Sequence, residues 1–163
     1  MSKSKSTFSF DDEQSVSQEE FYSDIENLLC FERAIRFCYA SMEMMVHNRT
    51  IRHQCQHFSK WSRTNEEELE KILQESPSSD YKTAKAHHPY GLPPDDFTME
   101  SVLSLGLVVA EHRLESYQEL RRQLPVRSRI VLNQIIAHVA EEIKFFKREK
   151  EIVSVEGILN SLN

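Results

Sequence analysis

The chain has 163 residues, enough for one domain with a hydrophobic core of its own. Its net charge of -6 argues against nucleic acid or an anionic membrane surface as a partner. The longest uncharged apolar run, residues 101–110, is half the roughly 20 residues that a membrane span needs, and the start of the chain lacks the apolar core of a signal peptide. We therefore predict a cytoplasmic protein that binds neither nucleic acid nor a membrane.

The first half of the chain predicts two helices. Residues 1–16 are rich in serine and charged residues and are predicted to form a flexible N-terminal arm. Ser17 and Glu20 have the spacing of a capping box, which places the start of the first helix at residue 17 and its end near residue 46. A short turn at 47–50 leads into a second helix that runs to about residue 75.

The second half has the same organisation after a long connection. Residues 76–97 contain four of the five prolines, so they are predicted to form a crossover and not a continuous helix. Thr98 is suited to cap a third helix, and Pro125 ends that helix and opens a fourth, which runs to about residue 153. The last residues, 154–163, predict a short amphipathic C-terminal helix.

These elements predict an all-α fold. Two helical hairpins joined by one long connection correspond to an antiparallel four-helix bundle of ferritin-like topology, with one crossover between the second and third helices and a short C-terminal helix. The bundle forms one domain, residues 17–153. Another antiparallel bundle or a coiled-coil hairpin is the alternative architecture.

The first helix has a charged residue in its apolar seam. Residues of this seam recur in steps of four and three, as side chains that face other helices do. They are Phe21, Ile25, Leu28, Glu32, Ile35, Tyr39, Met42 and Val46. Seven of the eight are apolar or aromatic, and the eighth is Glu32. An isolated buried carboxylate is costly, so Glu32 is predicted to have a cation or a hydrogen-bond donor beside it.

Residues 31–42, FERAIRFCYASM, place a glutamate and a tyrosine seven residues apart on one helix face, Glu32 and Tyr39. This pattern resembles the first helix of the ferritin-like superfamily, in particular its rubrerythrin-type members. The resemblance implies a bundle in which two carboxylates and two Glu-x-x-His motifs hold a pair of iron or manganese ions between the helices. It also implies an internal duplication, and a shift of 78 residues places Tyr39 on Tyr117 but Glu32 on Ala110.

The other helices depart from the motifs of that family. The second helix has Ser62 and Asn65 where the family carries Glu-x-x-His. In the fourth helix Glu142 occupies a seam, but the histidine, His138, lies one turn before it. Glu111 lies next to the position in the third helix that corresponds to Glu32. The candidate ligands of an iron or manganese site are Glu32, Glu111, His138 and Glu142.

Two functions are therefore open, and the sequence does not decide whether the chain is an enzyme. In the first, the bundle is a binding or structural module that self-associates and has lost or remodelled its di-metal site. Glu32 then pairs with an arginine, or bonds to Tyr39, Ser62 or Asn65 in a polar layer. In the alternative, the chain is an iron- or manganese-binding oxidoreductase or iron-handling protein with an unusual carboxylate and histidine site.

The third helix and the crossover are the predicted contact surfaces. Residues 102–110 are apolar on all sides, and Gly106 and Ala110 would let another helix approach closely. We predict a homodimer through this helix, with a covering by the crossover as the alternative. The crossover, which carries Tyr81 and Tyr90, is a candidate docking site for a protein partner.

Overall fold

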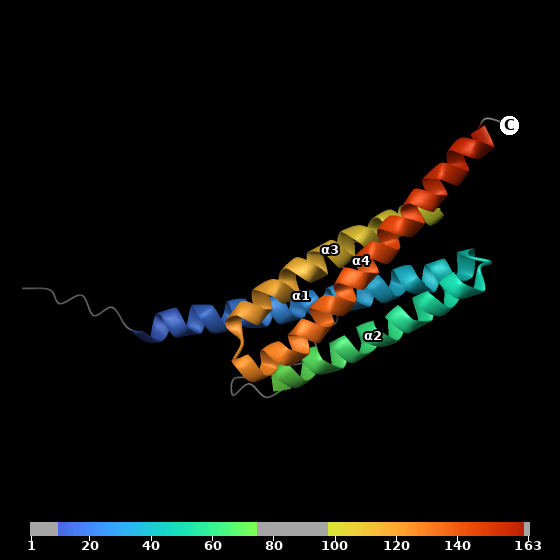
Figure 1. Ribbon diagram of the computed structural model, residues 1–163. Coiled ribbons are helices and arrows are strands. Elements are labelled where there is room, and N and C mark those ends of the chain that lie inside the picture. Colours follow the sequence, from blue (N-terminus) through green and yellow to red (C-terminus); the bar gives the residue numbers. More distant parts are fainter. Residues whose placement is uncertain (1–9, 75–97, 162–163) are drawn as a thin grey trace, which may run out of the picture.

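The computed structural model describes residues 10–74 and 98–161, which form four α-helices (Figure 1). The helices are α1 (Phe10–Met45), α2 (Arg49–Gln74), α3 (Met99–Gln123) and α4 (Val126–Ser161). No strand occurs in these residues. The predicted all-helical, four-helix protein is thereby confirmed, and the predicted second and third helices agree with α2 and α3 to within two residues at each end.

The helices pack in the order α2, α1, α3, α4. Figure 1 shows α2 running back along α1 and α4 running back along α3, with the two turns at opposite ends. The backbone of α1 also runs close to that of α3, whereas the backbones of α2 and α4 approach each other at few places. Within the described ranges, the backbones of α2 and α3, and those of α1 and α4, stay farther apart, although side chains of α1 and α4 still meet in the core. The two hairpins therefore approach most closely along α1 and α3.

The core follows the apolar seams that the sequence predicts. Burial of each large aliphatic side chain stabilises the fold by about 1.5–3 kcal/mol relative to its exposure. Fully or almost fully buried apolar residues come from all four helices: Ile25, Leu28, Ile35, Met42, Leu69, Leu73, Leu103, Leu120, Val139 and Phe146. None of the helices within the described ranges is long and apolar enough to cross a bilayer.

Side-chain caps fix the starts of α2 and α3. Thr98 caps α3 as predicted, because its hydroxyl accepts a hydrogen bond from the backbone N–H of Ser101 at 3.1 Å and the Ser101 hydroxyl accepts one from the Thr98 N–H at 3.0 Å. α2 is capped by Asn48, whose side-chain oxygen accepts from the N–H groups of Thr50 and Ile51 at 2.9 and 3.3 Å. Thr50 lies inside the first turn of α2.

Both ends of the bundle differ from the prediction. α1 begins at Phe10 and not at residue 17, because the segment FDDEQSV contains no helix breaker and its acidic residues suit a helix N-terminus. The predicted arm is thus helical from residue 10, and residues 1–9 lie outside the described chain. At the other end α4 continues without a break to Ser161, since Gly157 alone does not terminate a helix. No separate C-terminal helix forms at 154–161. The predicted crossover, residues 76–97, lies outside the described residues.

The small residues of α3 are used inside the bundle. Gly106 is buried, and a Cβ atom added there would lie 2.3 Å from Cε1 of Phe146 on α4. Phe146 in turn stacks on Tyr39 of α1, with ring centroids 5.5 Å apart. The close approach that was predicted for a second molecule therefore seats an aromatic ring of the same chain. On α3, Val108 is the one large apolar side chain that is exposed. A dimer through this helix stays a prediction.

Candidate functional site

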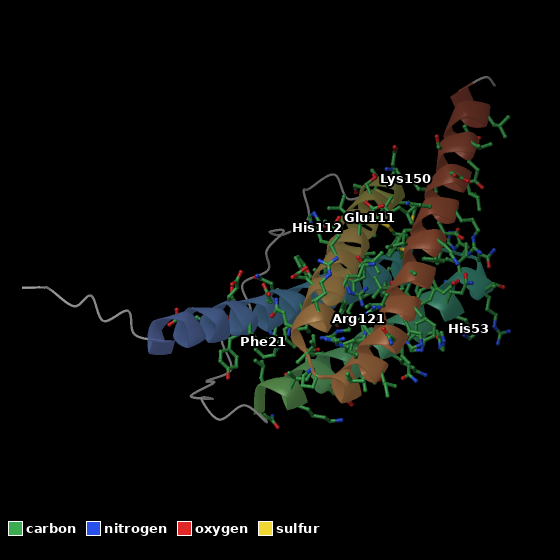
Figure 2. The ribbon with its side chains drawn as sticks, turned by 60° about the vertical axis from the view of Figure 1, so that its left-hand side comes forward. Phe21, His53, Glu111, His112, Arg121 and Lys150 are labelled. Atoms are coloured by element: carbon green, nitrogen blue, oxygen red, sulfur yellow. The ribbon has the colours of Figure 1, made fainter. Side chains whose placement is uncertain are left out.

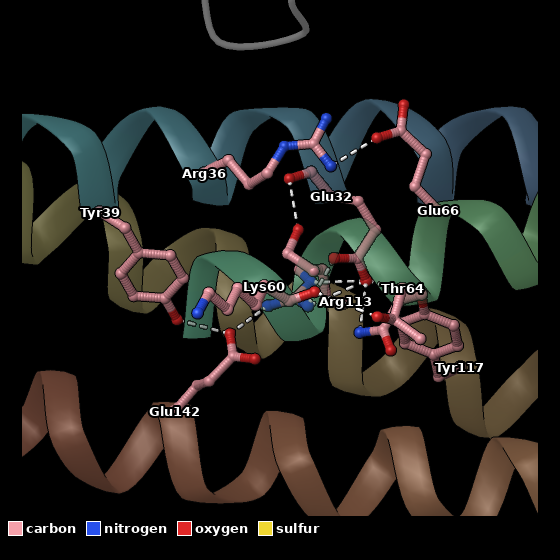
Figure 3. A network of polar contacts seen from close by, with 11 residues as sticks. Glu32, Arg36, Tyr39, Lys60, Thr64, Glu66, Arg113, Tyr117 and Glu142 are labelled. Atoms are coloured by element: carbon pink, nitrogen blue, oxygen red, sulfur yellow. Dashed lines mark hydrogen bonds and ion pairs between the residues drawn. The ribbon is translucent and has the colours of Figure 1, made fainter. Parts of the chain in front are cut away.

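A cluster of charged side chains lies in the centre of the bundle (Figure 3). Glu32 from α1, Arg113 from α3 and Glu142 from α4 each have no solvent-exposed surface. Figure 3 shows the guanidinium of Arg113 between the two carboxylates, with the rings of Tyr39 and Tyr117 on either side. These residues meet because each occupies a core-facing position of its helix.

Arg113 binds both carboxylates. Its Nη2 donates to both carboxylate oxygens of Glu32, at 2.9 and 2.7 Å, and its Nε donates to Oε1 of the same group at 3.2 Å. Its Nη1 forms an ion pair and hydrogen bond with Oε2 of Glu142. A planar guanidinium can bridge two carboxylates because its donors point along fixed directions in one plane. Arg113 therefore links α1 to α4 through α3.

The remaining donors complete the coordination of the carboxylates. The hydroxyl of Tyr39 donates to Oε2 of Glu142, and the hydroxyl of Tyr117 donates to Oε1 of Glu32, both at 2.6 Å. Asn65 of α2 donates its side-chain N–H to Oε1 of Glu32 at 3.3 Å. Burial and the adjacent carboxylates raise the pKa of both tyrosines well above the ordinary value, so both remain neutral donors.

The charges of this centre do not balance if both carboxylates are ionised. One guanidinium then faces two carboxylates, and one negative charge is left in the core. Oε1 of Glu142 is buried and has no hydrogen-bond partner among the described residues, whereas both oxygens of Glu32 have partners: Oε1 accepts from Asn65, Arg113 and Tyr117, and Oε2 accepts from Arg113. Burial raises the pKa of Glu142, and the charge of Arg113 offsets this only in part. Burial also acts to lower the pKa of Arg113, but the two carboxylates outweigh it and keep the guanidinium charged.

The four predicted metal ligands do not converge. Glu32 and Glu142 lie together at the centre, as described above. Glu111 lies on the outer side of α3 (Figure 2), where its carboxylate pairs with Lys147 at 3.2 Å. His138 stacks on Trp61 of α2 with ring centroids 3.9 Å apart, and burial together with the charge of His57 lowers its pKa. No group of three or more His, Cys, Asp or Glu side chains within the described ranges is arranged to hold a metal ion.

The residues at the centre do not fit the two-metal site that the resemblance implies. The Arg113 guanidinium lies where a bridging cation would have to bind, and it engages both oxygens of Glu32 and one of Glu142. α2 contributes the neutral side chains of Ser62 and Asn65 to the centre, and the Ser62 hydroxyl donates to the backbone carbonyl of Glu32 at 2.8 Å. The side chains of the centre are thus suited to binding a guanidinium. Binding of iron or manganese at this place stays a prediction.

Arg113 and Tyr117 are the members of the centre that the sequence reasoning did not identify as site residues. They belong to a seam of α3 that also recurs in steps of three and four, and its residues are Leu103, Gly106, Ala110, Arg113, Tyr117 and Leu120. An arginine at a core-facing position opposite a core-facing glutamate was the available signal.

A second charged cluster joins α1 to α2 near the surface. Glu66 accepts a hydrogen bond from Nε of Arg33 at 2.6 Å and also forms an ion pair with Nη1 of Arg36. The side chains of Arg33 and Arg36 are 30% and 23% exposed, and that of Glu66 is 14% exposed. Burial acts to raise the pKa of Glu66, but the hydrogen bonds and charges of the two arginines outweigh it and lower the pKa.

No protein-family model matches the chain, and comparisons with curated proteins and with solved structures likewise find no significant match.

Proposed function

We propose that the chain is a ferritin-like bundle in which an arginine replaces the di-metal centre, and that it serves as a binding or structural module that self-associates and does not catalyse a reaction. The observation that carries the proposal is the position of Arg113. Its fully buried guanidinium bridges Glu32 and Glu142, two carboxylates at positions where the resemblance implies ligands.

The order of the helices supports the ferritin-like part of the proposal. In a simple up-and-down bundle, helices that follow one another along the chain are neighbours. Here the backbones of α2 and α3 do not come close to each other within the described ranges, and α1 packs against α3 instead. A long crossover that carries the chain across the bundle, between the second and third helices, produces this order. The opposite placement of the two turns in Figure 1 agrees with it.

The chemistry of the centre supports a role without catalysis. A catalytic metal site keeps a coordination position open for water or substrate. In this centre the oxygens of Glu32 are occupied by Arg113, Tyr117 and Asn65, and every member is shielded from solvent. Arg113 supplies a fixed positive charge that compensates one of the two buried carboxylates without a bound ion. The centre then stabilises the bundle and fixes the register of α1, α3 and α4.

The alternative function is a metal-binding oxidoreductase or iron-handling protein, and one observation favours it. Oε1 of Glu142 is buried and has no hydrogen-bond partner among the described residues, so it could accept a cation. That reading uses two of the four candidate ligands, because Glu111 and His138 lie elsewhere. It also requires Arg113 to leave the carboxylates.

Metal analysis of the purified protein tests the proposal. We expect less than one iron or manganese ion per ten chains, both as purified and after reconstitution with Fe²⁺ or Mn²⁺ and desalting. We also expect the same thermal midpoint in EDTA as in either metal. Glu32→Ala and the distant Glu66→Ala serve as matched variants. Stoichiometric metal that is lost in Glu32→Ala and kept in Glu66→Ala would replace the proposal with the alternative.

A further inference from the structure

The outer face of α4 carries most of the exposed large apolar side chains of the described chain. Six of the eight such residues lie on this helix. Val126 and Ile130, near its start, are 72% and 62% exposed, and Ile152, Val155 and Leu159, near its end, are 45–57% exposed. The sixth, Val131, lies to one side. The end of α4 projects beyond the other helices in both Figure 1 and Figure 2.

These residues form one line along the helix. At about 100° per residue, the two apolar groups lie within roughly 40° of a single line, on the side opposite the buried Leu132, Val139 and Phe146. We call this line the outer stripe. Between its apolar ends the outer stripe carries Glu141, Lys144 and Arg148, all exposed. Ile130 and Val155 are separated by 25 residues, which is about 38 Å along the helix.

We propose that α4 pairs with α4 of a second copy of this chain, antiparallel and about a two-fold axis, through the outer stripe. This pairing places Ile130 opposite Val155 of the partner subunit and Val126 opposite the partner's Leu159. A two-fold axis repeats both contacts, so each apolar end covers the other. The inference gives a surface to the self-association in the proposed function, but it does not depend on the Arg113 centre.

The charges in the middle of the stripe favour the antiparallel arrangement. Within one chain, Glu141 pairs with Lys144 at 2.8 Å, and both side chains are more than half exposed. In the antiparallel register Glu141 lies opposite the partner's Lys144, and Lys144 lies opposite the partner's Glu141. A parallel, in-register pairing would instead align Lys144 with Lys144 and Arg148 with Arg148. Like charges directly opposite one another are unfavourable, so the stripe is complementary to its own reverse.

The separation of the two apolar ends argues for a helix as the occupant. A small apolar ligand would cover one end only, and a membrane surface that contacted both ends would have to bury the charged segment between them. A straight helix with apolar groups about 38 Å apart and complementary charges between them matches the whole stripe. α4 of a second copy has these features, at the same spacing.

Cysteine cross-linking tests the register directly. In a Cys30→Ser background, the double variant Ile130→Cys/Val155→Cys should form a covalent dimer on mild oxidation. Ile130→Cys and Val155→Cys alone should form none, because each cysteine lies about 38 Å from its own copy. Val108→Cys is the matched control on α3, and it would cross-link to itself in a dimer through that helix. Dimers in Val108→Cys and none in the Ile130→Cys/Val155→Cys double variant would overturn the inference.

Light scattering over a range of protein concentrations measures dimerisation independently, in variants with substitutions on the helix surface. Val155→Glu should weaken the dimer by on the order of 100-fold, while Val108→Glu leaves it unchanged. Glu141→Lys should weaken it by roughly tenfold, and Glu141→Lys/Lys144→Glu should restore it. Far-UV circular dichroism checks that each variant is folded. A wild-type chain that stays monomeric at every concentration contradicts the pairing, and this result would leave the metal test of the proposed function unaffected.

Discussion

The two charged clusters of the bundle have opposite compositions. At the centre, one arginine serves two carboxylates, Glu32 and Glu142, and all three are fully buried. At the α1–α2 edge, two arginines, Arg33 and Arg36, serve one carboxylate, Glu66, and all three are partly exposed. The pKa shifts follow the compositions: that of Glu142 is raised by burial, and that of Glu66 is lowered by its arginines.

The difference shows how burial changes the value of an ion pair. At the edge, water screens the charges, and each pair contributes little net stability. In the core, water cannot compensate a charge that loses its partner. Removal of one member therefore lowers the free energy of unfolding by much more than the intact pair contributes to it. The central cluster therefore specifies how α1, α3 and α4 fit together, and the edge cluster adds a modest α1–α2 contact. Variants at each cluster separate these roles.

Removal of the shared cation should have the largest effect. Arg113→Met leaves two carboxylates facing each other in the core, and we expect the free energy of unfolding to fall by about 3–5 kcal/mol. Urea denaturation measures it. Arg33→Met, a matched change at the edge, should cost less than about 1 kcal/mol. Equal losses in the two variants would contradict the distinction between the clusters.

The two central carboxylates should not be equivalent. In Glu32→Gln an amide N–H₂ would face donors from Arg113, Tyr117 and Asn65, and we expect a loss of about 3 kcal/mol. Glu142→Gln resembles the protonated carboxyl, with its carbonyl oxygen accepting from Tyr39 and Arg113, and should cost about 1 kcal/mol or less near neutral pH. Chemical denaturation of both variants measures the difference. If Glu142→Gln is the more damaging, the two carboxylates do not differ in the expected way.

A change in the packing at Phe146 should have the next largest effect on stability. Gly106→Ala gains about 1 kcal/mol of helix propensity, but its Cβ would lie 2.3–2.9 Å from the ring of Phe146. Over-packing of this kind costs about 1–3 kcal/mol, so we expect a net loss of roughly 1 kcal/mol. Thermal unfolding measures it, with the exposed Gly157→Ala as the control that should be neutral or stabilising. A stabilised Gly106→Ala would show that Phe146 can move freely.

The pH dependence should be smaller and opposite in sign for the two clusters. Glu142 has a raised pKa in the fold, so its contribution is full below the usual value of 4.5 and is lost as pH rises through the folded pKa. Glu66 has a lowered pKa, so its contribution is present above 4.5 and is lost as pH falls through the folded pKa. Unfolding free energies at several pH values, compared with Glu142→Gln and Glu66→Gln, should show the two slopes disappear separately. A wild-type curve that neither variant changes would refute both assignments.

Most of the fold and half of the site could be predicted from the sequence. Helix periodicity, Thr98 and Pro125 predict the four helices, because these signals act locally along the chain. The start of α1 was not predicted, because Ser17 and Glu20 match a capping box that lies inside the helix, and the extent of α4 was not, because its last turns are exposed. Glu32 and Glu142 were predicted from their seams. Arg113 was not, because the pairing of three helices depends on their order in space, which one sequence does not record.

We propose that the guanidinium of Arg113 takes the place of a metal between Glu32 and Glu142. A crystal structure of protein grown with Mn²⁺ or Fe²⁺, with anomalous scattering data collected at the metal edge, tests it most directly. We expect the guanidinium to bridge the carboxylates and no anomalous peak within bonding distance of either one. A peak between Glu32 and Glu142, with Arg113 displaced, would show that a metal and not the guanidinium occupies this position.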